Sequence, residues 1–126
     1  MKLSNMENLI FSYAHYKIVD FYKLMEFFAG LQEKGMFSIE KADSGRKILS
    51  GAFIRPYPKN HWNPMAKSPT ARQVIGHVSV NGDNFKIETM TKSGLKTARQ
   101  LVESELGEAI LFEKEDYEDP LDRFRG

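Results

Sequence analysis

The chain contains no cysteine and has only three histidines among its 126 residues. Without cysteine it has no disulfide framework and no thiolate chemistry, and a zinc domain needs more Cys and His ligands than this chain supplies. A strong excess of charge of one sign is also missing, since 18 Lys and Arg stand against 17 Asp and Glu. The near-neutral total excludes a plain polybasic or polyacidic binding protein.

Long apolar runs are absent as well. The most apolar stretch near the start, residues 9–19, contains His15 and Lys17, whereas a bilayer-spanning helix needs roughly 20 consecutive apolar residues. The stretch also lacks a small-residue cleavage site for a signal peptide, so it is expected to belong to the mature fold. The sequence therefore predicts a protein without membrane association, located in the cytoplasm, of a length that suits one domain.

Capping and glycine signals predict a long helix over residues 5–34. Residues 4–7 form a capping-box pattern, and Gly35 stands where a helix commonly ends. Apolar residues recur at helical spacing along one face of this segment. Val19 and Phe27 fall on the opposite, charged face, which predicts either two exposed apolar side chains or a homodimer contact through this helix.

Alternating patterns beyond this helix predict two antiparallel hairpins. The first joins residues 36–42 to residues 47–55 through turn residues 43–45. The second joins residues 73–80 to residues 85–91 through an Asn-Gly-Asp-Asn turn, which supplies the positive φ angles of a tight hairpin. In the second hairpin the side chains expected to face the core are Val78, Val80, Phe85 and Ile87.

The remaining segments complete an α+β architecture. Residues 56–71 hold four of the five prolines and predict a long ordered loop. A second helix is expected over residues 93–106 and a short last strand over residues 109–112. The order αββ-ββαβ indicates a mainly antiparallel sheet packed against two helices. The expected single domain covers residues 1–112, and residues 113–126 are expected to form an acidic, flexible tail.

The charges divide sharply along the chain. Residues 44–99 hold ten Lys and Arg against Asp83 and Glu88, a net charge of +8. Residues 100–122 hold nine acids against Lys114, a net charge of −8. Basic residues interleaved with aromatic residues are typical of a nucleic-acid surface. The alternative is that the acidic block folds over the basic block, so that the two neutralise each other in the monomer or across a dimer.

The start of the second helix is a candidate anion site, because lysines at a helix N-terminus are unfavourable unless an anion meets them. Thr91 or Ser93 is expected to cap this helix, and Lys92 and Lys96 to hold a phosphate, a carboxylate or the acidic tail itself. The alternative is a plain cap with two solvated lysines.

The proline-rich loop is a second candidate, since it contains the only tryptophan of the chain. Trp62 is expected either to stack on a base, a sugar or a partner side chain, or to pin the loop onto the core. Taken together, the residues expected to bind an anionic partner are Arg55, Lys59, His61, Trp62, Lys67, Arg72, Thr91, Lys92, Ser93 and Lys96.

Common catalytic signatures are missing from the sequence, including the G-x-S-x-G and H-E-x-x-H patterns. His77 lies opposite Glu88 in one register of the second hairpin and opposite Lys86 in the other, and a cross-strand surface pair is the common explanation of either arrangement. His15, His61 and His77 have no ligand spacing, so neither a metal site nor a cofactor is expected.

These observations favour a non-enzymatic binding or regulatory domain for an anionic partner, with nucleic acid as the first class of partner. The alternative is a protein-interaction or inhibitor module that uses the acidic tail, residues 113–122, and the first helix. A further alternative is a small hydrolase or nuclease with His61 or His77 as its base.

Overall fold

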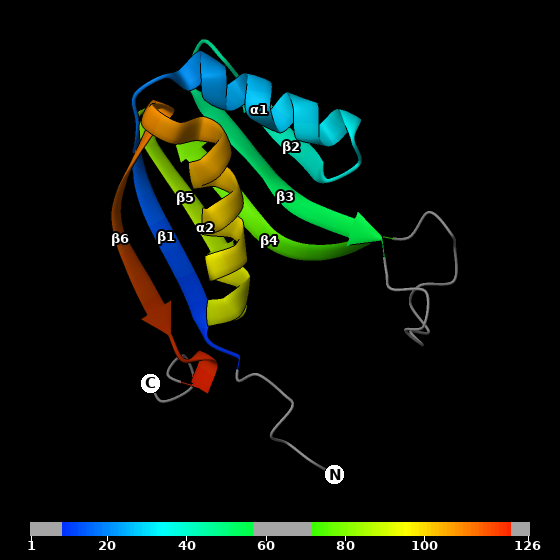
Figure 1. Ribbon diagram of the computed structural model, residues 1–126, viewed down its shortest axis with the longest axis vertical. Helices are drawn as coiled ribbons and strands as arrows, with labels where there is room; N and C mark the ends of the chain where they lie inside the picture. The colour runs from blue at the N-terminus through cyan, green and yellow to red at the C-terminus, as the bar shows by residue number, and fades with distance from the viewer. Residues whose placement is uncertain (1–8, 57–71, 122–126) are drawn as a thin grey trace.

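The computed structural model describes residues 9–56 and 72–121 (Figure 1). Its elements are β1 Phe11–Ile18, α1 Phe21–Glu33, β2 Phe37–Asp43, β3 Ile48–Pro56, β4 Arg72–Asn81, β5 Asn84–Thr89, α2 Lys92–Leu106, η2 Gly107–Ala109 and β6 Ile110–Glu118. The strands form one antiparallel sheet in the spatial order β2-β3-β4-β5-β1-β6. Both helices lie on the same face of the sheet (Figure 1). Within the described residues, neither helix is long and apolar enough to cross a membrane.

The prediction of one long helix over residues 5–34 is wrong in its first half. Residues 11–18 form β1, which pairs with β5 on one side and β6 on the other, and the helix covers only Phe21–Glu33. Ala14, Tyr16 and Ile18 are buried at every second position, as a strand requires. The apolar residues of this segment recur at every second position, but Ala14 and Ile18 also stand four residues apart. The same spacing therefore fits one face of a helix.

The residue that caps α1 is Asp20, and not the capping box predicted upstream, whose residues lie outside those described. The Asp20 side chain accepts a hydrogen bond from the Lys23 backbone N–H at 3.1 Å. Val19 is exposed and precedes the helix, while Phe27 lies on the helix and packs partly against the core. The two side chains therefore do not share a charged helix face, which was the basis for a homodimer contact there.

Both hairpins form where the sequence predicts them. The pairing of Asn81 with Asn84 leaves Gly82 and Asp83 as a two-residue turn, and Gly82 has a φ of +64°. This register places His77 opposite Glu88. The four side chains expected to face the core are all buried: Val78, Val80, Phe85 and Ile87.

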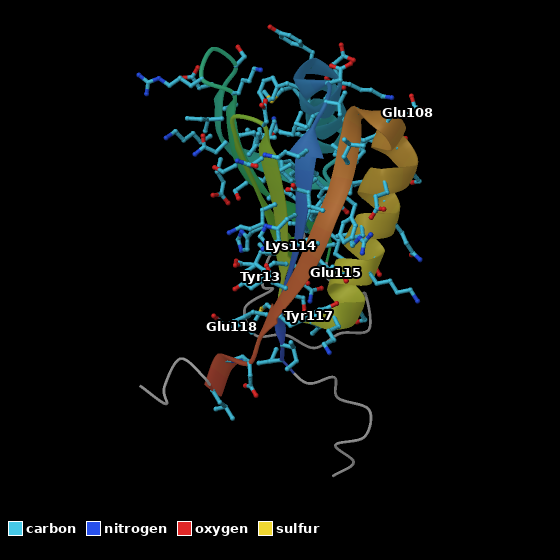
Figure 2. All side chains as sticks on the ribbon, turned by 90° about the vertical axis from the view of Figure 1, so that its left-hand side faces the viewer. Tyr13, Glu108, Lys114, Glu115, Tyr117 and Glu118 are labelled. Carbon is cyan, nitrogen blue, oxygen red and sulfur yellow. The ribbon has the colours of Figure 1, made fainter. Side chains whose placement is uncertain are left out.

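The last strand is longer than predicted. β6 pairs with β1 from Ile110 to Glu118 and forms one edge of the sheet (Figure 2). The prediction of a flexible acidic tail from residue 113 is therefore wrong for residues 113–118, whereas residues 122–126 lie outside the described residues. The strand escaped detection because charge, not alternation, dominates its sequence. The alternative of a protein-interaction or inhibitor module relied on a free acidic tail. Residues 113–118 of that tail belong instead to an edge strand of the sheet.

An aromatic cluster holds α1 on the sheet. The ring of Phe28 lies 4.5 Å from that of Phe37, 6.0 Å from that of Phe53 and 5.9 Å from that of Phe85, measured between centroids. Aromatic pairs at such distances add to the stabilisation that burial alone provides. The buried stripe of α2 packs separately, mainly on β5 and β1, through Leu95, Val102 and Leu106.

Gly51 on β3 and Gly30 on α1 offer a matched pair of stability tests. A Cβ at Gly51 would collide with the Ser38 carbonyl oxygen and the Phe37 ring, so Gly51→Ala should lower the free energy of unfolding by about 1–3 kcal/mol. A Cβ at Gly30 meets nothing within 4 Å, so Gly30→Ala should raise it by up to about 1 kcal/mol. Urea unfolding followed by circular dichroism measures both, and equal stability of the two variants would contradict this packing.

Candidate functional site

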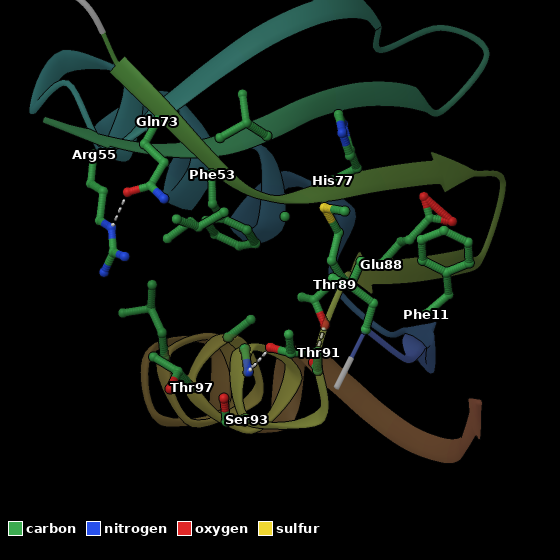
Figure 3. Close-up of a pocket in the computed structure, with 18 residues that line it drawn as sticks. Phe11, Phe53, Arg55, Gln73, His77, Glu88, Thr89, Thr91, Ser93 and Thr97 are labelled. Atoms are coloured by element: carbon green, nitrogen blue, oxygen red, sulfur yellow. Dashed lines mark hydrogen bonds between the residues drawn. The ribbon is translucent and has the colours of Figure 1, made fainter. Parts of the chain in front are cut away.

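A cavity of about 730 Å³, here called the α2 cleft, lies between α2 and the ends of β3 and β4 (Figure 3). The cleft exists because the C-terminal end of β3 and the N-terminal end of β4 diverge from β5 and from α2 (Figure 1). A register shift between Phe53 and Ile54 marks a bulge in this pair of strands, and bulges bend and twist a sheet locally. The bend opens the hollow beside the first turns of α2.

The lining of the cleft is mostly apolar. Phe53 is buried at the floor, and Ala98 and Leu101 contribute from α2. Val74 and Ile75 lie at the β4 side with 53% and 40% of their surface exposed. An apolar hollow with a few polar groups is the usual form of a ligand site.

Charged groups stand at opposite ends of the cleft (Figure 3). At one end the Arg55 Nε donates a hydrogen bond to Oε1 of Gln73 at 3.1 Å, and the two residues are partners across β3 and β4. This bond fixes the guanidinium, whose other N–H groups suit a carboxylate or a phosphate. Glu88 stands at the other end, across from His77.

The start of α2 forms one wall of the cleft. Thr91 is the cap, because its Oγ1 accepts a hydrogen bond from the Gly94 backbone N–H at 3.0 Å. Beneath it, the buried Thr89 donates its hydroxyl to the Thr91 carbonyl oxygen at 2.7 Å. Gly94 allows this approach, since a Cβ there would stand 3.0 Å from the Thr91 hydroxyl. Of the two residues expected to cap the helix, Thr91 does so, and Ser93 lines the cleft.

Lys92 and Lys96 lie in a different groove, of about 520 Å³, which they share with Arg99, Glu115 and Tyr117. The Lys92 ammonium stands 4.6 Å from the centroid of the Tyr117 ring. The Arg99 guanidinium contacts Glu115 at 3.1 Å. Here the acidic block meets the basic block within the monomer, as the alternative interpretation of the charges expected for this part of the chain.

Arg99 and Glu103 join α2 to β1 and β6. Arg99 Nε lies 2.7 Å from a carboxylate oxygen of Glu103, and the Tyr16 hydroxyl donates to the same oxygen at 2.8 Å. Burial, followed by the hydrogen bond to Glu103 and its charge, raises the pKa of Tyr16. Desolvation acts to raise the pKa of Glu103, but hydrogen bonds from Arg99 and Tyr16 and the charge of Arg99 outweigh it and lower that pKa.

The structure therefore gathers only part of the predicted binding set. Arg55, Thr91 and Ser93 line the α2 cleft, while Lys92 and Lys96 line the second groove. Arg72 begins β4, but its side chain lies outside the described residues. Four further predicted residues also lie outside them: Lys59, His61, Trp62 and Lys67.

Sequence reasoning missed the β4 side of the cleft. Two consecutive apolar residues, Val74 and Ile75, interrupt the alternation of β4 and were the local signal of the bulge. The Arg55–Gln73 bond had no such signal, because it depends on how β3 and β4 pair beyond that bulge. Comparison of the chain with protein-family models, with curated proteins and with solved structures finds no match.

The Glu103 network predicts an acid-sensitive contribution to stability. The pKa of the Glu103 carboxyl is lower in the folded state than its ordinary value of 4.5. The stabilisation that Glu103 provides is therefore present above its unfolded-state pKa and is lost as the pH falls through its folded-state pKa. The wild-type chain should exceed Glu103→Gln in stability at neutral pH, and the gap should narrow below about pH 4.5. Urea unfolding across pH measures the gap, with Glu105→Gln, an exposed position of α2, as control. A gap for Glu103→Gln that does not change with pH would contradict the assigned role.

Proposed function

We propose that this protein is a non-enzymatic binding domain whose α2 cleft holds an anionic partner. The observation that carries the proposal is, among the described residues, a cation beside an apolar hollow: Arg55, hydrogen-bonded to Gln73, and the floor at Phe53. An anionic group binds the guanidinium, and an uncharged part of the same partner fills the hollow.

Two classes of partner combine these chemical properties. Nucleic acid, the class that the sequence favours, offers phosphates and, where it is single-stranded, flat bases. An acidic polypeptide offers carboxylates and apolar side chains. The proposal concerns the chemistry that both classes share, and it involves no catalysis, because the arrangement of His77 and Glu88 is that of an ordinary cross-strand pair.

Among the described residues that line the cleft, Arg55 is the only lysine or arginine. Arg46 and Lys47 lie at the opposite end of β3, where they stand 3.7 Å from Asp43 and 3.9 Å from Asp83. Arg99 is occupied by Glu103 and Glu115 in the second groove. Among the described residues, the anionic group of the partner is therefore assigned to Arg55.

Neutralising Arg55 should weaken binding without unfolding the protein, since its side chain is exposed. Two labelled probes test this by fluorescence anisotropy at low salt: an oligothymidylate and a peptide of alternating Glu and Phe. Arg55→Gln should lower the affinity for at least one probe roughly tenfold, whereas Arg46→Gln, a cation at the far turn, should leave it unchanged. Added salt should weaken the wild-type complex.

Comparison of Arg55→Gln with the control variant Arg46→Gln decides whether the cleft binds anions. If Arg55→Gln and Arg46→Gln bind both probes as the wild-type chain does, or if neither probe binds the wild-type chain at low salt, the cleft is not an anion-binding site.

A further inference from the structure

One edge of β4 is open inside the α2 cleft. β4 pairs with β3 from Arg72 to Asn81, but it pairs with β5 only from His77 to Asn81. In the part of the chain that the structure describes, residues 72–75 therefore have no strand beside them on the β5 side. Gly76, in contrast, is buried against the end of β5, where a Cβ would stand 3.2 Å from the Glu88 carbonyl oxygen. Residues 73–75 all line the cleft, so this edge faces the hollow.

The edge is open because the chain leaves the sheet early on its β5 side. β5 ends at Thr89 and α2 begins at Lys92. The Met90 carbonyl oxygen accepts a hydrogen bond from the Ile10 backbone N–H at 3.0 Å, which ties this junction to the segment before β1 and not to β4. Backbone N–H and C=O groups on an open strand edge are the groups that an added strand binds.

We propose that an extended polypeptide with an acidic residue at one end binds in the α2 cleft as an added strand on residues 73–75 of β4. This inference rests on the proposed function of the cleft and specifies the class of its partner. The partner forms main-chain hydrogen bonds with β4, places apolar side chains against the floor at Phe53, and places a carboxylate at Arg55.

The charges at the two ends of the cleft favour a polypeptide over a nucleic acid. Arg55 stands at one end and Glu88 at the other (Figure 3). A polyanion that runs the length of the cleft brings a phosphate toward Glu88, where it is repelled. A polypeptide avoids this repulsion, because it can carry an acidic residue at the Arg55 end and a neutral or basic residue at the Glu88 end.

The geometry of a strand also defines the sequence pattern of the partner. Three residues of a strand span roughly 10 Å, and successive side chains point to opposite faces. One set of alternate side chains enters the hollow between Phe53 and the α2 wall, and the other set faces away from it. The expected motif therefore has apolar residues at every second position and an acidic residue at one end.

The first experiment selects ligands from a displayed library of random peptides about ten residues long, with the full chain as bait. Selection on the wild-type chain should enrich the alternating motif with Asp or Glu at one end. Selection on Arg55→Gln should keep the apolar alternation but lose the acidic preference. Selection on Arg46→Gln, the matched control, should return the wild-type motif.

The second experiment tests the main-chain hydrogen bonds with a synthetic peptide of the selected sequence. N-methylation of the amides that face β4 should weaken binding about tenfold for each bond lost, whereas N-methylation of the intervening amides should have little effect. The bound peptide should also slow hydrogen exchange of β4 amides within residues 73–75, which contacts between side chains alone would not do.

The outcomes separate this inference from the proposed function. Selection that yields no peptide motif, or peptide binding that is indifferent to the position of N-methylation, overturns strand addition. If an oligothymidylate then binds in an Arg55-dependent manner, the partner is nucleic acid and only the polypeptide assignment fails. If neither probe shows dependence on Arg55, the proposed function fails as well.

Discussion

The pairing of β1 between β5 and β6 is the constraint on which the rest of this fold depends. It joins the N-terminal strand to the last strand, and it buries Tyr16 between the sheet and α2. The Tyr16 hydroxyl needs a partner there, and Glu103 of α2 supplies it. Glu103 in turn needs a cation, which is Arg99, and Arg99 also binds Glu115 of β6. One buried phenol thus explains why the basic and acidic parts of the chain meet beside α2.

The α2 cleft follows from the way in which the two helices are attached. The Phe28 cluster holds α1 over the β2 and β3 side of the sheet, while α2 packs mainly on β5 and β1. Between these two attachments the ends of β3 and β4 curve away (Figure 1). The hydrogen bond between Thr89 and Thr91 fixes the point at which α2 leaves the sheet. The hollow and the open edge of β4 have this common origin.

The sequence was most informative where a short segment is compatible with few backbone conformations. The Asn-Gly-Asp-Asn turn specified the second hairpin, and Gly107, with a φ of +52°, marked the end of α2. The N-terminal strand was misread because Ala14 and Ile18 suit a helix and a strand equally, and only pairing with two neighbours decides between them. The α2 cleft was missed because it depends on a register shift between β3 and β4. The apolar pair Val74 and Ile75 signals that shift, but it does not give the position of α2 beside it.

The acidic character of β6 has a consequence for the protein in concentrated solution. β6 is an edge strand, and an exposed edge is a template for pairing with the edge of another molecule. Of its carboxylates, Glu115 contacts Arg99 and Asp116 contacts His15 and Lys114. Glu113 and Asp116 are exposed on the strand. Two such edges that approach each other bring like charges together. The acidic residues that led to the prediction of a flexible tail therefore oppose aggregation through the β6 edge of the sheet.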